Sequence, residues 1–122
     1  MAADYMNLSA TIEAAIADAR AKVRVGYPWW LRPFLARDVI GITLGRRIYL
    51  SHRIAARTDA SLERLLRHEL VHVAQVNRLG LFRFLFAYVT EFLRHFWRVR
   101  SVSRAYRLIS FEIEAYAAEQ AL

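Results

Sequence analysis

The chain has 122 residues, which is the size of one small domain, and residues 1–122 are expected to form a single unit. Its 57% hydrophobic and 24% charged residues exclude a disordered or low-complexity protein, and its net charge of +7 comes almost entirely from arginine. Cysteine is absent, so any metal must be held by His, Asp or Glu.

The first predicted element is a helix over residues 8–24, in which apolar residues recur at helical spacing and Ser9 is a suitable N-cap. A glycine and two prolines, Gly26, Pro28 and Pro33, break the chain after it. Aromatic residues lie among these breakers, at Trp29, Trp30 and Phe34. We expect them to anchor the loop to a small core rather than to bind a ligand.

Two short runs rich in β-formers surround Gly45 and Arg46, which predicts a β-hairpin over residues 39–51. Three helices are predicted after it, at about residues 60–79, 81–98 and 103–121. Thr58 or Asp59 can cap the first of these helices, and Gly80 can end it. The order of helix, hairpin and three helices predicts a mainly helical α+β fold.

The motif that indicates chemistry is His68-Glu69-Leu70-Val71-His72, an HExxH sequence inside the predicted helix 60–79. Residues four apart on a helix lie one above the other, so both imidazoles can reach one zinc ion. Glu69 can then lie beside the water that the metal activates and act as general base. The sequence therefore predicts a zinc site on this helix.

A helical wheel with about 100° per residue places the motif between two faces. The stripe that we expect to be solvated holds Arg64, Arg67, Val71, Gln75 and Arg78. Both histidines fall at the border of this stripe, which predicts a metal at the wall of a cleft. Glu69 falls on the apolar side, where a buried carboxylate is costly unless something there needs it.

Two histidines do not complete a zinc site, which usually has three protein ligands and one open position for water. A distant carboxylate is the expected third ligand, and the candidates are Glu91, Glu112, Glu114, Glu119 and, before the motif, Asp59. Glu112 borders the apolar stripe of the last predicted helix, whereas Glu114 lies about 160° away, near Arg107. We favour Glu112, because a carboxylate among apolar neighbours needs a partner more than one beside an arginine does.

Residues 66–74 resemble the active-site helix of zincin metallopeptidases, and residues 112–115 are similar to the ExxA element of the gluzincin branch. This resemblance implies a minimal gluzincin in which His68, His72 and Glu112 bind zinc and Glu69 is the base. The run HELxHxxQ, ending at Gln75, is also similar to small bacterial zincin-like domains. Tyr116 departs from the pattern, because gluzincins often place Asp four residues after the ligand Glu.

The predicted function is that of a zinc-dependent metallopeptidase acting on a peptide or protein substrate. The hairpin strand at residues 47–51 is a candidate for binding an extended peptide by strand addition. A hydrolase also needs a group that stabilises the oxyanion, and the sequence leaves several candidates open: Tyr88, Tyr106, Tyr116, His52, His95 and the arginines.

One alternative is a non-catalytic domain that keeps zinc as a binding or assembly element. A fourth protein ligand such as Glu114 or His95 would favour that alternative, because it would fill the open position. A further alternative is a basic peripheral protein in which HExxH is incidental.

The helix predicted over residues 81–98 has a wide face rich in Leu and Phe, and we expect this face to be buried. A peripheral membrane or oligomer contact is the alternative. The arginine run that follows, Arg98, Arg100, Arg104 and Arg107, comes with no nucleic-acid-binding motif, so a solvated basic face is expected. No signal peptide or transmembrane segment is evident, which favours a cytoplasmic location.

Overall fold

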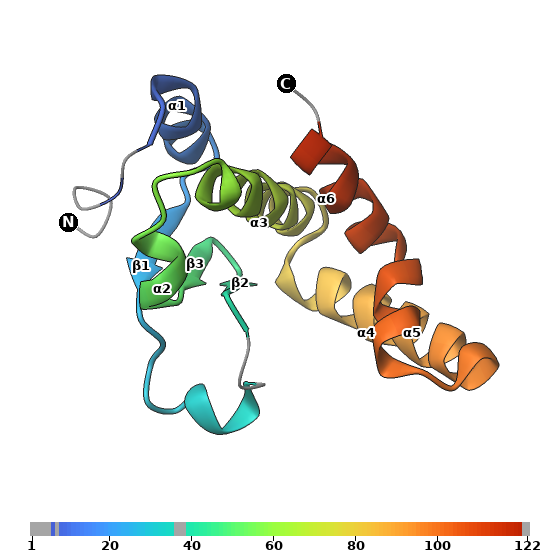
Figure 1. The fold of residues 1–122 in the computed structure, drawn as a ribbon. Helices are drawn as coiled ribbons and strands as arrows, with labels where there is room; N and C mark the ends of the chain where they lie inside the picture. Colours follow the sequence, from blue (N-terminus) through green and yellow to red (C-terminus); the bar gives the residue numbers. More distant parts are fainter. Residues whose placement is uncertain (1–5, 7, 36–38, 121–122) are drawn as a thin grey trace.

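The computed structural model describes residues 6, 8–35 and 39–120, and it confirms the mainly helical α+β fold. Helix α3 runs through the middle, with the sheet and α1 on one side and the last helices on the other (Figure 1). The elements in chain order are α1 (Ala10–Asp18), β1 (Lys22–Val25), the 3-10 helix η2 (Arg32–Phe34), β2 (Gly41–Leu44), β3 (Arg47–Leu50), α2 (His52–Ala55), α3 (Ser61–Leu79), α4 (Leu81–Val99), α5 (Val102–Leu108) and α6 (Ser110–Gln120).

The first helix is shorter than predicted, because its expected C-terminal part forms a strand instead. Ser9 is the N-cap, as predicted, and its hydroxyl accepts a hydrogen bond from the backbone N–H of Ile12. The helix ends at Asp18, and the chain turns at Arg20, whose φ of 55° is left-handed. Lys22–Val25 then pairs with β3, so pairing within the sheet overrides a helical pattern that continues through Val23.

The sheet has three strands in the order β1-β3-β2. Strands β2 and β3 form the predicted antiparallel hairpin, in which Thr43 is opposite Ile48, and β1 pairs with β3 in parallel. Gly45 in the hairpin turn has a φ of 64°, a conformation that favours glycine. The candidate strand for peptide binding, at residues 47–51, is not an edge strand: β3 is central in the described sheet, and both of its edges are already paired.

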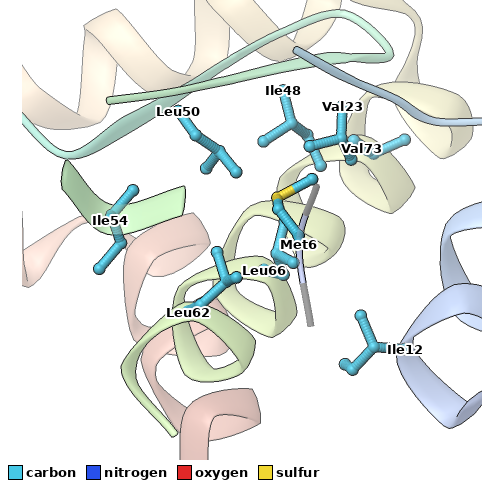
Figure 2. Packing of buried hydrophobic residues seen from close by; sticks show 9 residues of the cluster. All are labelled: Met6, Ile12, Val23, Ile48, Leu50, Ile54, Leu62, Leu66 and Val73. Carbon is cyan, nitrogen blue, oxygen red and sulfur yellow. The ribbon is translucent and has the colours of Figure 1, made fainter. Parts of the chain in front are cut away.

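The core lies between the sheet, α1 and one face of α3 (Figure 2). Its buried residues are Met6, Ile12, Val23, Ile48, Leu50, Ile54, Leu62, Leu66 and Val73. The prediction that aromatic residues anchor the loop after β1 is wrong, because Trp29 is 82% exposed and Trp30 is 48% exposed. Among the described side chains of this loop, Leu31 is the buried one, and the side chain of Phe34 lies outside the described part of the structure.

Helices α3 and α4 have nearly the predicted bounds. Asp59, one of the two expected caps, accepts a hydrogen bond from the backbone N–H of Ser61 at the start of α3. Gly80 ends α3 as predicted, and its φ of 87° turns the chain directly into α4.

The last predicted helix is divided into two. The backbone N–H and the hydroxyl of Ser110 both donate to the carboxylate of Glu91 on α4, while Ile109 adopts an extended conformation and is fully buried. The carboxylate of Glu91 thus provides the backbone N–H of Ser110 with an acceptor where the helix is interrupted. As a result α5 packs along α4 and α6 packs along α3, which brings Glu112 to the HExxH helix.

The prediction that α4 is buried is wrong, because Phe84 is its one buried residue. The side chains on its outer side are exposed, although most of them are apolar. The arginines that follow, Arg98, Arg100, Arg104 and Arg107, are exposed as expected. Within the described residues, the helices are too short or too polar for any of them to cross a bilayer.

Candidate metal centre

His68 and His72 lie one turn apart on α3, and both imidazoles face the first turn of α6. The Nε2 atom of His68 lies 2.9 Å from Oε1 of Glu112, and Nε2 of His72 lies 3.2 Å from the same oxygen. One potential ligand atom from each of the three residues falls within 4.8 Å of the others. The structure therefore brings together the three residues that were predicted to bind the metal.

The outer nitrogen of each histidine also has an acceptor. Nδ1 of His68 lies 3.0 Å from Oε2 of Glu119, and Nδ1 of His72 lies 2.9 Å from Oε1 of Gln75. An imidazole whose Nδ1–H donates in this way presents the lone pair of Nε2 to a cation, as is usual for metal-binding histidines. Glu119, a candidate ligand in the sequence, thus lies behind His68 rather than beside Glu112.

Without a cation, this arrangement favours doubly protonated histidines, because both nitrogens of each ring face acceptors. Burial disfavours the charged rings, but the hydrogen bonds to Glu112 and to the Nδ1 acceptors, together with the charges of Glu69 and Glu112, outweigh it and raise the pKa of His68 and of His72. Burial likewise opposes the charge on Glu112, yet its hydrogen bonds to the two histidines lower its pKa. The site therefore concentrates positive charge in the interior around one carboxylate.

His68, His72 and Glu112 could hold a metal ion, and a divalent cation would place two positive charges at one point and leave both rings neutral. Two imidazole nitrogens and one carboxylate oxygen are a donor set typical of catalytic zinc. Zinc ligands at about 2.1 Å in tetrahedral geometry are about 3.4 Å apart. The separations of 2.9 and 3.2 Å need to open by only a few tenths of an ångström.

Glu69 follows the first histidine and is buried beside the ligand group, on the side of the sheet. Its Oε2 accepts a hydrogen bond of 2.6 Å from the hydroxyl of Thr43 on β2. Burial raises the pKa of Glu69, although the hydrogen bond from Thr43 opposes the shift. A carboxylate with a raised pKa is suited to accepting a proton and releasing it again near neutral pH.

Three tyrosines surround the ligand group. The hydroxyl of Tyr88 on α4 donates to Oε2 of Glu112 over 2.5 Å, and burial followed by the charge of Glu112 raises the pKa of Tyr88, so it remains a donor. Burial and the same charge raise the pKa of Tyr106. Tyr116 packs edge-on against the ring of His68, at 4.6 Å between ring centroids, and is 41% exposed.

The remaining oxyanion candidates lie elsewhere in the described structure. His52 is on α2, where its ring approaches Gly26. His95 lies toward the end of α4 and is not part of the ligand group.

Gln75 corrects the predicted solvated stripe of α3, because its side chain is fully buried. Its Oε1 faces His72, while its Nε2 donates to the carbonyl of Phe111 and to the carboxylate of Glu114, both at 3.1 Å. The amide thus satisfies its own hydrogen bonds, orients His72 and joins α3 to α6. The position of Gln75, three residues after His72 on one helix face, is the sequence signal that could have shown this role.

Glu114, the alternative third ligand, contacts Gln75 and is exposed. The prediction that the metal lies at the wall of a cleft is also wrong. His68 is 5% exposed and His72 is 7% exposed, because α6 covers them. Sequence reasoning missed Thr43, the hydrogen bond from Tyr88 to Glu112 and the orienting role of Glu119, since they depend on how β2, α4 and α6 pack around α3.

Residues 34–80 match the family model of the eCIS core domain. The matched segment is less than half of the chain and contains β2, β3, α2 and α3, and therefore Thr43 and the whole HExxH motif. It ends before α4 and before Glu112. None of the curated proteins and none of the solved structures matches the chain.

Proposed function

We propose that this chain is a zinc-dependent metallopeptidase of minimal gluzincin type, in which His68, His72 and Glu112 hold the metal. The observation that supports the proposal is the convergence of two Nε2 atoms and one carboxylate oxygen on a single buried point, with Glu69 beside it. Neither Glu114 nor His95 is a fourth member of the ligand group within the described residues, so a coordination position stays available for water.

When bound, zinc lowers the pKa of a water molecule and polarises the carbonyl of the substrate. Glu69 takes the proton from the attacking water and later delivers it to the leaving amine. Thr43 donates to one carboxylate oxygen of Glu69, which leaves the other oxygen to act as the base. Glu119 and Gln75 hold the two imidazoles in the orientation that the ligands need.

The substrate contacts in this proposal come from β2 and α6. Strand β2 is at an edge of the sheet and contributes Thr43, so an extended peptide that adds to this strand would lie next to Glu69. Tyr116 is the candidate for stabilising the oxyanion, because it is partly exposed and its ring contacts His68. Tyr88 is less suited, since its hydroxyl is already bound to Glu112.

The test compares the wild-type protein with Glu69→Gln on a library of peptides. We expect zinc-dependent cleavage by the wild type and a loss of roughly 100- to 10,000-fold in the variant, because a general base is removed. Zinc content should not change, since Glu69 is not a ligand. Glu13→Gln on the exposed side of α1 is the matched control and should cleave normally. Equal cleavage by Glu69→Gln would contradict the proposal.

A second candidate function, a zinc-containing domain without catalysis, is favoured by the burial of the ligands. His68 is 5% exposed, His72 7% and Glu112 2%, so a substrate has little direct access to the metal. In that case the wild-type protein would bind zinc and gain thermal stability from it, but it would cleave no peptide of the library. The same two measurements therefore distinguish the two candidates.

A further inference from the structure

Helix α4 carries apolar side chains on two sides, and one of these sides is uncovered within the described structure. Its inner side packs on the metal centre: the ring of Phe84 contacts that of His72, and Tyr88 binds Glu112. Its outer side bears a continuous apolar row, which we call the α4 stripe and which consists of Phe82, Leu85, Phe86, Val89, Leu93 and Trp97. Every member is at least 44% exposed, and Phe82 reaches 85%.

Spacings of three and four residues place the α4 stripe along one line of the helix. Exposed apolar patches of this kind mark surfaces that bind a partner or a membrane. In Figure 1, α4 and α5 extend away from the sheet and α1. The outer side of α4 is therefore the region of the described surface where a partner is most needed.

The charge around the stripe indicates which partner it is. Arg83, Arg94 and Arg98 are exposed and lie roughly 90–150° around the helix from the centre of the stripe, along one flank. At its C-terminal end, the guanidinium of Arg100 lies 4.2 Å over the ring of Trp97. Residues 81–110 contain six arginines but a single acidic residue, Glu91, whose carboxylate is bound to Ser110.

We propose that the α4 stripe and its flanking arginines dock on an anionic lipid surface. The apolar row enters the boundary between head groups and acyl chains, while the arginines extend their side chains to the lipid phosphates. Phe and Trp on one face with Arg beside them is the residue pattern of helices that lie in the plane of such a surface.

A second copy of this chain fits the stripe less well than an anionic membrane does. Pairing two α4 stripes would bring the arginine-rich segments of both copies together, and like charges at an interface oppose association. Anionic lipid neutralises the same arginines. Because the inner side of α4 contacts His72 and Glu112, docking would hold the metal centre close to the lipid surface.

The test is flotation of the 122-residue chain with vesicles of phosphatidylcholine, with and without phosphatidylglycerol. We expect binding to the anionic vesicles, weakened by salt, and little binding to the neutral ones. The charge variant Arg83→Gln/Arg94→Gln/Arg98→Gln should lower binding by roughly 10- to 100-fold, because each basic residue contributes near an anionic surface. Its matched control, Arg24→Gln/Arg53→Gln/Arg64→Gln, removes three exposed arginines outside α4 and should change binding much less.

The apolar half of the proposal is tested by Phe82→Ser/Phe86→Ser/Trp97→Ser, which should abolish flotation. The matched control is Trp29→Ser/Trp30→Ser, which removes two exposed aromatic side chains from the loop after β1 and should leave binding intact. A variant that keeps the stripe, Trp29→Phe/Trp30→Phe, retains Trp97 as its single tryptophan. Its fluorescence should be quenched by lipids brominated on their acyl chains.

Three outcomes would overturn the proposal. The first is equal binding to neutral and anionic vesicles, and the second is an unquenched Trp97 in the presence of anionic vesicles. The third is a wild-type protein that does not bind vesicles but forms a stable dimer in sedimentation, while the α4 serine variant is a monomer. That result would assign the α4 stripe to a second copy of the chain.

Discussion

Helices α3 and α4 have the same length of 19 residues, but they distribute polar and apolar side chains in opposite ways. Helix α3 buries two histidines, a glutamate and a glutamine, whereas α4 exposes phenylalanines, leucines and a tryptophan. Each helix thus departs from the usual partition between interior and surface. A bound cation would explain the buried polar groups, and the proposed lipid surface would explain the exposed apolar groups.

The largest expected effect is the loss of zinc affinity when one of the three proposed ligands is removed. Replacing Glu112 by alanine should lower zinc affinity by more than about 100-fold, because it removes a charged ligand and leaves the two histidines to hold the metal. Glu114→Ala, two residues away on α6, is the matched control and should change affinity only a few-fold. Zinc titration in the presence of a competing chelator measures both. A larger loss in Glu114→Ala would show that the wrong carboxylate was chosen.

Apolar substitutions should show the contrast between a covered helix and an uncovered one. Leu66→Ala on α3 should lower the free energy of unfolding by about 2–5 kcal/mol, because it leaves a cavity at a fully buried position. Phe86→Ala on α4, at a side chain that is 76% exposed, should change it by less than about 0.5 kcal/mol. Urea unfolding of the metal-free proteins measures the difference. Similar losses for both would mean that the outer side of α4 is covered in solution.

A substitution of Gln75 tests whether its side-chain amide orients His72. Gln75→Ala should lower zinc affinity roughly 10- to 100-fold, because His72 loses the acceptor of its Nδ1–H. The control is Arg78→Ala, which changes an exposed residue on the same helix and should leave zinc affinity unchanged. Competition with a chelator again provides the measurement, and an unaffected Gln75→Ala protein would show that the amide does not orient the ligand.

The smallest expected effect is on the pH dependence of stability. In the metal-free protein the raised pKa of His68 and of His72 stabilises the fold fully below the ordinary value of 6.5, and this contribution is lost as pH rises through the raised values. Glu69, whose pKa is also raised, acts in the same direction above its ordinary value of 4.5. The metal-free protein should therefore become less stable as the pH rises above about 6.5.

Zinc should reverse this trend, because the ligands bind the metal in their deprotonated forms. Thermal unfolding with and without zinc across that range provides the measurement. Parallel pH profiles for the two forms would contradict the assignment of the histidines as ligands.

The features that the sequence predicted are those encoded within one element. The hairpin follows from β-rich runs around Gly45, and the bounds of α3 follow from its periodicity and from Gly80. The spacing within HExxH places both histidines on one side of α3, and the apolar surroundings of Glu112 favoured it over Glu114. The structure agrees with both of these predictions about placement.

The features that were mispredicted depend on contacts between elements. Strand β1 exists because β3 offers it a parallel partner, and the break before Ser110 exists because Glu91 binds that residue. A helical wheel cannot show that α6 covers Gln75 or that the outer side of α4 remains uncovered. Tertiary packing decides these points, and local pattern carries little information about it.

The metal content of the protein tests the central claim most directly. Elemental analysis of the wild type, loaded with zinc and freed of excess, should find about one zinc ion per chain, and the His68→Ala/His72→Ala variant should retain none. Zinc retained in that double variant at the wild-type level, or a wild type that binds none, would contradict the account.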